Sequence, residues 1–217
     1  MTKRVAVILA GSGVYDGSEI YETTLTLLRL SQLGAEVQCF APNIEQMHVI
    51  NHLTGEVMAE SRNVLVEAAR LARGNIKALS AANANDFDAL IIPGGFGAAK
   101  NLSNFAVEGS NLTVNTEVAA FAKAIHQQNK PIGLMCIAPV MSQALLGNGV
   151  KTTIGNDKGT ADAVNSTGAI HVDCKVDEIC VDADKKLVTT PAYMLANSIS
   201  EAAIGINKLV ENVLELV

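Results

Sequence analysis

Cys136 stands at the end of a short apolar run, residues 131–135, that is typical of a buried strand. Small and turn-prone residues follow it directly, so the chain is expected to turn sharply there into a helix. Such a turn leaves its central residue exposed above the edge of the sheet, which is the geometry of a nucleophile elbow. Here the elbow carries a thiol, and the positive end of the following helix favours the thiolate. The pattern predicts an enzyme with a cysteine nucleophile.

Two further turns carry groups that suit a nucleophilic cysteine. Glu19 follows the first apolar run, and Gly94 and Gly95 follow a later one. Because ligands bind outside the carboxyl ends of parallel strands, these turns should converge with Cys136 at one edge. The carboxyl of Glu19 should then lie within hydrogen-bond reach of the sulfur or the substrate. The amides of both glycines and of Ile137 should hold an oxyanion. Plainer roles, a helix-terminal acid and a tight glycine turn, are also open.

Two patterns that often mark cofactor or metal sites are weak in this chain. Gly11 and Gly13 resemble the start of a dinucleotide-binding turn, but Asp16 stands where the third glycine belongs. Its negative charge would repel a pyrophosphate. His48 and His52 have the spacing of one helical face, but they lie in a predicted hairpin without an obvious third ligand. We therefore expect no organic cofactor and no metal.

The composition predicts one globular domain covering residues 1–217. The chain is 49% hydrophobic and 18% charged, and it is long enough to bury a substantial core. Its net charge of -6 and its 4% aromatic content argue against nucleic-acid binding, which uses basic stripes and stacking platforms. No apolar run approaches the length that spans a membrane, so we expect neither nucleic acid nor a membrane as a partner.

The four cysteines are Cys39, Cys136, Cys174 and Cys180, and none forms a Cys-x-x-Cys pair. A chain of this size does not need disulfides, so we interpret them as reduced thiols. The N-terminal apolar run, residues 5–10, is too short for the core of a signal peptide and better predicts a first strand. These observations together predict a cytoplasmic protein.

Strands and helices are expected to alternate along the chain. β-rich runs predict strands near 5–9, 37–40, 89–92 and 131–135, with further short candidates around 152, 172, 179 and 187. Helical spacing and caps predict helices from 16 or 18 to 34, and at 62–73, 114–128, 141–146 and 193–214. Residues 47–58 contain two short segments around Thr54 and Gly55, which indicates a hairpin excursion. The alternation favours an α/β fold around a mostly parallel sheet.

Five stretches of the chain, residues 13–20, 49–56, 93–105, 135–139 and 189–195, carry a family resemblance. They resemble the ThiJ/PfpI superfamily of class I glutamine amidotransferase-like proteins, and within it the isoprenoid biosynthesis (enhancing lycopene biosynthesis) group. The resemblance covers essentially the whole chain and implies a flavodoxin-like three-layer sandwich and a homodimer. It makes Cys136 the elbow cysteine, Glu19 its partner carboxyl, and Gly94 and Gly95 the backbone donors. It also implies a glutathione-independent glyoxalase activity that turns glyoxal into glycolate.

This chain lacks the histidines that other members of the superfamily use as catalytic bases, which narrows the reactions that it could catalyse. Protease-like members place a histidine directly after the cysteine, where this chain has Ile137. Amidotransferase relatives use a histidine near the last helix, where this chain has the stretch 190–193 without one. No obvious base is supplied for a Cys-His hydrolase, and the remaining Cys-Glu pair suits aldehyde chemistry better.

The favoured hypothesis is a glyoxalase that acts on a small dicarbonyl, glyoxal or methylglyoxal. Cys136 attacks an aldehyde carbon to give a hemithioacetal, and Glu19 moves a proton between the two substrate carbons. Hydrolysis of the resulting thioester releases glycolate or lactate without a metal or organic cofactor.

Two alternatives to this hypothesis stay open. The protein could sense oxidative or carbonyl stress, or mediate an interaction, through oxidation of Cys136. It could also be a cysteine hydrolase that recruits His126 or His171 from elsewhere in the fold or from a dimer partner.

Overall fold

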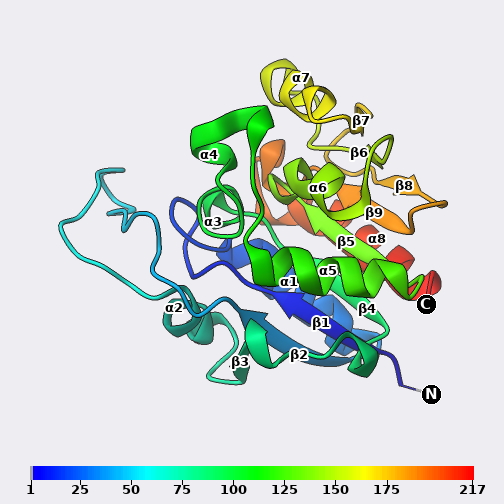
Figure 1. The fold of residues 1–217 in the computed structure, drawn as a ribbon, viewed down its shortest axis with the longest axis horizontal. Helices are drawn as coiled ribbons and strands as arrows, with labels where there is room; N and C mark the ends of the chain where they lie inside the picture. The colour runs from blue at the N-terminus through cyan, green and yellow to red at the C-terminus, as the bar shows by residue number, and fades with distance from the viewer. Residues whose placement is uncertain (1) are drawn as a thin grey trace.

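A seven-stranded sheet forms the centre of the computed structural model, which describes residues 2–217 (Figure 1). Its strands lie in the order β3 (Ile76–Ala78), β2 (Glu36–Ala41), β1 (Arg4–Ile8), β4 (Ala89–Ile92), β5 (Ile132–Met135), β9 (Leu187–Thr190) and β8 (Cys180–Asp182). All neighbouring strands are parallel except β8, which runs antiparallel to β9. A small second sheet pairs β6 (Lys151–Thr152) with β7 (Ile170–His171). The prediction of a mostly parallel central sheet is confirmed.

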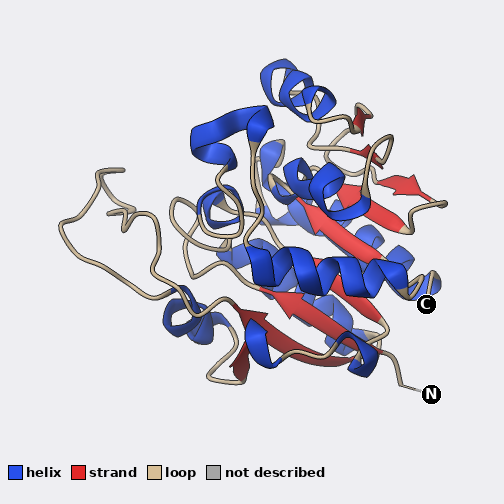
Figure 2. Ribbon diagram, in the orientation of Figure 1, coloured by secondary structure: helices blue, strands red, loops and turns tan. Residues whose placement is uncertain are grey.

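Helices cover both faces of this sheet (Figure 2). One layer contains α1 (Ile20–Gln32), α2 (Val64–Leu71) and α8 (Ile199–Glu215). The other contains α3 (Phe96–Lys100), α4 (Phe105–Glu108), α5 (Thr116–Gln127), α6 (Ser142–Leu146) and α7 (Lys158–Ser166). The arrangement is the three-layer, flavodoxin-like sandwich that the sequence predicted.

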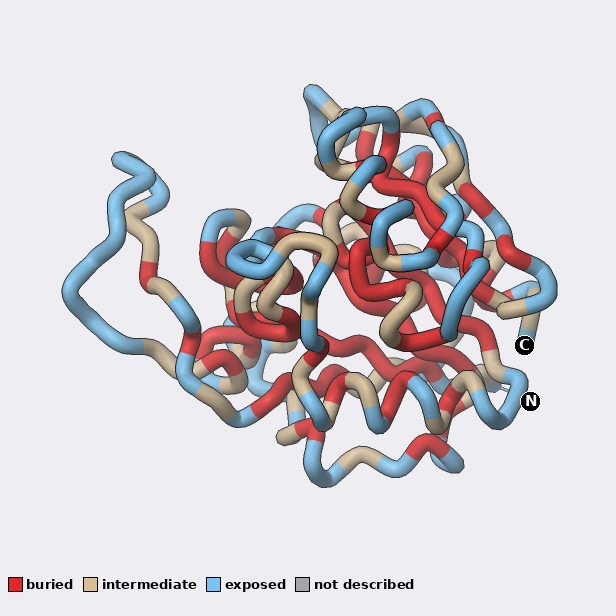
Figure 3. Tube along the Cα trace, turned by 45° about the horizontal axis from the view of Figure 1, so that its top comes forward, coloured by how far each residue is buried: buried red, intermediate tan, exposed pale blue. Residues whose placement is uncertain are grey.

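Two hydrophobic cores, one on each face, hold the layers together. Buried segments run through the middle of the molecule (Figure 3). In β1, Val5 and Val7 belong to one core, and Ala6 and Ile8 belong to the other. Successive side chains of a strand point to opposite faces, so a strand covered on both sides must be apolar throughout. This is why the central strands appear in the sequence as short uninterrupted apolar runs.

The final helix begins later than the sequence predicted. Residues Ala192–Met194 form a separate turn of 3₁₀ helix, and α8 starts only after Ser198. The Ser198 hydroxyl accepts a hydrogen bond from the backbone N–H of Glu201 at 3.2 Å, which caps the new helix. Ser198 itself has a φ of -149° and a ψ of 161°, an extended conformation that separates α8 from this turn. The break frees the backbone that follows β9 to contribute to the site.

Residues 42–63 leave the sheet between β2 and α2 and form a long excursion, drawn in cyan in Figure 1. Ile50 and Val57 make an isolated antiparallel bridge, so the excursion contains a short, irregular hairpin. Its tip is open to solvent, and the side chain of Leu53 is 93% exposed. In the part of the chain that the structure describes, no helix is long and apolar enough to cross a bilayer.

Two glycines in helices test how tightly the layers pack. A Cβ added at Gly205 in α8 would lie 2.5 Å from Thr190 Oγ1 and 2.6 Å from the carbonyl oxygen of Val176. We expect Gly205→Ala to lower the free energy of unfolding by about 1–3 kcal/mol because of this overpacking. A Cβ at Gly159 in α7 meets only the Asp157 carboxylate at 3.7 Å, so Gly159→Ala should raise stability by up to about 1 kcal/mol. Urea denaturation of both variants measures the contrast, and a neutral Gly205→Ala would contradict the packing described.

Candidate active site

Cys136 lies in the sharp turn directly after β5, at the carboxyl edge of the sheet. Its φ of 59° is a left-handed conformation that is uncommon for a residue with a side chain. Its backbone N–H donates to the carbonyl of Thr190 at 3.0 Å, which ties the turn to β9. The neighbouring Gly94 must lack a side chain, because a Cβ there would overlap the side chain of Cys136. The predicted sharp turn after the strand is therefore present, but its cysteine is 7% exposed and not open above the sheet edge as the sequence suggested.

The carboxyl group that contacts the Cys136 thiol belongs to Glu22, not to Glu19. Glu22 is fully buried, and its two oxygens accept hydrogen bonds from the N–H of Gly94 at 2.8 Å and of Tyr193 at 3.1 Å. The carboxylate of Glu19 instead caps α1 by accepting the N–H of Glu22 at 2.7 Å. The position that the sequence analysis gave to Glu19 is thus occupied by the residue three places later.

The reason for this shift is where α1 begins. The helix starts at Ile20, so Glu19 is the N-cap and its side chain turns back onto the first turn. Glu22 is three residues further on, on the same inward face as Thr26 and Leu30, and all three are buried. This i, i+4, i+8 spacing is the signal in the sequence that could have identified Glu22.

Backbone amides surround the sulfur from two sides. The N–H groups of Gly95 and Ile137 hydrogen-bond the Cys136 sulfur and oppose the rise of its pKa. The N–H of Gly94 does not point at the sulfur, because it donates to the Glu22 carboxylate. The sequence predicted that the amides of Gly94, Gly95 and Ile137 would all face the reacting centre. Those of Gly95 and Ile137 do lie at the sulfur. That of Gly94 instead orients the carboxyl group of Glu22.

Burial dominates the electrostatics of the pair. It raises the pKa of Cys136 well above that of an ordinary thiol, and the neighbouring carboxylate of Glu22 raises it further. Burial and the charge of Glu19 raise the pKa of Glu22 to about 7. Burial also raises the pKa of Glu19. The segment after Cys136 is a 3₁₀ turn, Ala138–Met141, before the short α6, so the dipole effect expected from a following helix does not outweigh burial.

A mostly apolar cavity of about 380 Å³ opens over the sulfur. Its walls come from segments that are far apart in the sequence: Val14 before α1, Phe96 in α3, Thr160 in α7, and Tyr193 and Met194 after β9. The pKa of the Tyr193 phenol is raised by partial burial and by the nearby carboxylates. Thr160 is the only aliphatic hydroxyl on the wall, so a bound molecule meets chiefly hydrocarbon around the thiol.

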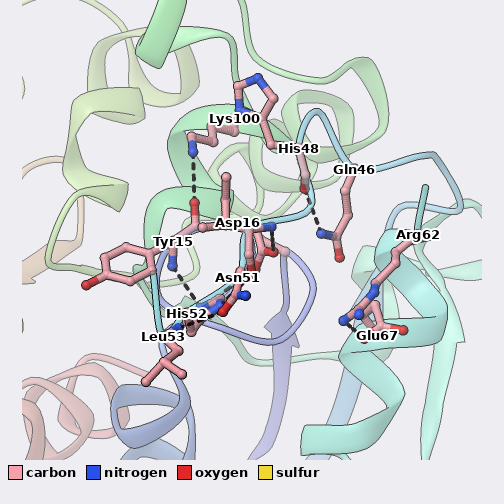
Figure 4. Close-up of polar contacts among 12 residues, drawn as sticks. Tyr15, Asp16, Gln46, His48, Asn51, His52, Leu53, Arg62, Glu67 and Lys100 are labelled. Carbon is pink, nitrogen blue, oxygen red and sulfur yellow. Dashed lines mark hydrogen bonds and ion pairs between the residues drawn. The ribbon is translucent and has the colours of Figure 1, made fainter. Parts of the chain in front are cut away.

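The loop before α1 is fastened to the excursion (Figure 4). A carboxylate oxygen of Asp16 accepts the N–H of Ile50 at 2.7 Å, and the N–H of Tyr15 donates to His52 Nε2 at 3.2 Å. The ring of His52 also lies 4.9 Å, centroid to centroid, from that of Tyr15. Asp16, which breaks the dinucleotide pattern in the sequence, therefore has a structural role in holding the excursion.

The histidines lie away from the thiol. His126 is at the end of α5 beside Lys185, and His171 accepts the N–H of Ile154 at 3.3 Å and lies beside Asp173. Within residues 2–217, no three His, Cys, Asp or Glu side chains are grouped to hold a metal ion.

Comparison with known proteins adds the family context. The model of the DJ-1/PfpI family matches residues 3–197. The human glutamine amidotransferase-like class 1 domain-containing protein 3, mitochondrial, is 50% identical over 98% of this chain and 83% of its own length. The zebrafish ES1 protein, mitochondrial, is 34% identical over 98% of this chain and 85% of its own. A crystal structure of an isoprenoid biosynthesis protein with an amidotransferase-like domain from Ehrlichia chaffeensis superposes with a TM-score of 0.93 at 36% identity, covering 99% of each chain.

These relatives correct one prediction and confirm another. The curated relatives are named as mitochondrial, so the cytoplasmic location predicted from the sequence is wrong. The physical reason is that reduced cysteines indicate a reducing compartment without distinguishing one such compartment from another. The isoprenoid biosynthesis resemblance is confirmed by the Ehrlichia structure. With a family match over residues 3–197 and close relatives along nearly its whole length, this chain belongs to the DJ-1/PfpI family.

Proposed function

We propose that this protein is a cofactor-independent glyoxalase that converts glyoxal to glycolate, and methylglyoxal to lactate, with Cys136 as nucleophile. The observation that carries the proposal is the contact between the Cys136 thiol and the fully buried carboxyl of Glu22, which has a pKa of about 7. A group with a pKa near neutrality can both accept and donate a proton under working conditions, as a general acid-base catalyst must.

The reaction begins with proton transfer from the thiol to Glu22. The sulfur then adds to one aldehyde carbon, forming a C–S bond and an oxyanion that takes up a proton to give the hemithioacetal. Glu22 removes the hydrogen of that carbon as a proton while the oxygen of the second carbon takes up a proton, which gives an enediol. Glu22 then returns a proton to the second carbon as the hydroxyl of the first carbon loses its proton. The first carbon is thereby oxidised to a thioester and the second is reduced to an alcohol. Water hydrolyses the thioester, which releases the hydroxy acid and restores the thiol.

The surroundings of the pair support each of these steps. The amides of Gly95 and Ile137 already donate to the sulfur, so they are positioned to stabilise negative charge that develops beside it. The hydrogen bonds from Gly94 and Tyr193 fix the orientation of the Glu22 carboxyl group. Its proton exchange is therefore directed toward Cys136 and the substrate bound to it. The apolar walls of the cavity limit the access of water while the enediol exists.

The names of the relatives are compatible with other chemistries, which the site supports less well. Glutamine amidotransferases and cysteine peptidases need a base that activates the cysteine and protonates a leaving amine. His126 and His171 lie among other partners, so neither supplies that base within the chain. The isoprenoid name of the Ehrlichia protein describes a pathway and identifies no reaction for this site.

Oxidation of Cys136 is a second candidate, and the donors around the sulfur favour it. The amides of Gly95 and Ile137, with Glu22 when protonated, offer three hydrogen-bond donors to a sulfinate. Hydrogen peroxide supplies the two oxygen atoms in two steps, and each step releases water. Glyoxal turnover below about one per second, with ready sulfinate formation detected by mass spectrometry, would favour a sensor over a dedicated enzyme.

Replacement of Cys136 directly tests the proposed glyoxalase activity. We expect Cys136→Ala to abolish the glutathione-independent formation of glycolate from glyoxal, with an unchanged circular dichroism spectrum. Cys174→Ala is the matched control, because Cys174 is a buried thiol whose side chain is hydrogen-bonded to Thr153, and this variant should keep its activity. Turnover retained in Cys136→Ala would contradict the mechanism.

A pair of carboxyl variants tests which glutamate transfers the proton. Glu22→Gln should lower kcat by about 10²–10⁴-fold, the usual contribution of general acid-base catalysis. Glu19→Gln should lower it by less than about tenfold, because the amide oxygen of glutamine can still accept the N–H of Glu22 and only the charge is lost. Since that charge raises the pKa of Glu22, Glu19→Gln should also move the acid limb of the pH–rate profile to lower pH. A large loss in Glu19→Gln with a small one in Glu22→Gln would restore the assignment made from the sequence.

The raised pKa of Glu22 also predicts how stability changes with pH. In the unfolded chain this carboxyl has its ordinary pKa of 4.5, whereas in the folded protein its pKa is about 7. Stability is therefore lost as pH rises between these values, by about 3 kcal/mol in total. We expect Glu22→Gln to remove this loss, as measured by urea denaturation at pH 5 and pH 8. The exposed Glu56→Gln is the control, and equal pH dependence in all three proteins would refute the prediction.

A further inference from the structure

The cavity over Cys136 adjoins a second, larger one. This outer cavity has a volume of about 620 Å³ and shares three apolar wall residues with the first: Phe96, Phe105 and Ile137. Ile137 directly follows the nucleophile, and the side chain of Phe96 is 48% exposed, so little backbone separates the two spaces. The two cavities are therefore neighbouring parts of one hollow at the carboxyl edge of the sheet.

This hollow is much larger than glyoxal needs. Glyoxal has four non-hydrogen atoms, and it fills roughly the volume of two or three water molecules, on the order of 60–90 Å³. Cavities of about 380 and 620 Å³ each have the size that usually holds a far larger ligand. A site shaped for glyoxal alone would leave most of this apolar space unfilled.

The excursion builds one side of the outer cavity. Ile50 and Gly55 of the excursion and Tyr15 of the loop before α1 line it together with Ala99 of α3 and Ala106 of α4. The hydrogen bond from Ile50 to Asp16 holds the excursion in this position. The excursion projects from the sheet and has no hydrophobic core of its own. Its position is nevertheless defined, because it forms part of the cavity wall near Cys136.

A single charged residue lines the two cavities, and it is Lys100 at the end of α3. Its ammonium donates one hydrogen bond to the carbonyl of Tyr15 at 2.8 Å (Figure 4). It also lies 5.5 Å from the ring centroid of Phe96. Two of its three N–H groups are not used by that bond. Partial burial lowers the pKa of Lys100, since water solvates this ammonium poorly. The nearby carboxylate of Asp16 is committed to the N–H of Ile50 and lies outside the lining.

We infer that the outer cavity is a second subsite of the same binding site, and that the protein takes an elongated apolar molecule with an anionic end. The anion pairs with Lys100, the apolar body lies against Phe96 and Phe105, and the reactive carbonyl reaches Cys136. The part of the inference that concerns the carbonyl rests on the proposed function. The part that concerns the anion and the apolar body rests only on the cavity and its one cation.

Binding to a catalytically silent protein tests the inference without turnover. We expect Cys136→Ala to bind octanoate, measured by isothermal titration calorimetry, more tightly than its neutral isostere octanamide. Adding Lys100→Gln should weaken octanoate binding by roughly tenfold or more and leave octanamide unchanged, because only the charged hydrogen bond is lost. Lys123→Gln, at an exposed position on α5, is the matched control and should leave both affinities unchanged. Equal binding of the two ligands, or no effect of Lys100→Gln, would overturn the inference.

A second pair of variants tests whether the ligand binds in the outer cavity. Ala106 lines the outer cavity, whereas its neighbour Val107 on the same short helix is 66% exposed and does not. In the Cys136→Ala protein, Ala106→Trp should fill the cavity and abolish octanoate binding, and Val107→Trp should leave it intact. Octanoate binding that survives Ala106→Trp would overturn the inference.

The outcomes for this site and for the proposed function are separable. Octanoate binding that depends on Lys100, in a protein that does not turn over glyoxal, would sustain the subsite and refute the glyoxalase. Glyoxal turnover without any octanoate binding would sustain the glyoxalase and refute the subsite.

Discussion

The burial of one carboxyl group, that of Glu22, is the constraint on which the rest of the site depends. A carboxyl group removed from water must be satisfied by hydrogen bonds, and Glu22 obtains them from Gly94 and Tyr193 and through its contact with Cys136. These partners follow three different strands. The same contacts that satisfy Glu22 therefore hold the turns after β4, β5 and β9 in register around the sulfur.

That burial is also what suits the carboxyl group to the proton transfers of the proposed reaction. A solvated glutamate would be fully ionised at neutral pH and could only accept a proton. Burial and the charge of Glu19 raise the pKa of Glu22 to about 7, where both protonation states are accessible. Strain at Cys136, whose φ is 59°, is tolerated for the same reason: the surrounding turns fix its backbone and aim its sulfur at the carboxyl group.

Much of the fold was predictable because its signals are local. The parallel strands are short apolar runs, and α1, α2 and α5 end close to where helical spacing stops. The excursion after Ala41 showed its turn at Thr54 and Gly55. The late start of α8 was not predictable from spacing, since residues 193–198 are compatible with a helix in their pattern. The extended backbone of the N-cap Ser198 is what separates them from α8. The predicted cytoplasmic location was wrong because reduced thiols are compatible with more than one compartment.

By itself, the sequence determined the chemistry available: a cysteine at a strand-to-helix turn, glycines at the next turn, and acids at the start of α1. It could not choose between Glu19 and Glu22, because both lie beside the same helix start and the choice depends on which side chain the helix turns toward β5. It could not show that Lys100 and the excursion share a cavity wall with the residue after Cys136. Those are contacts between segments far apart in the chain, and only the packing of the layers brings them together.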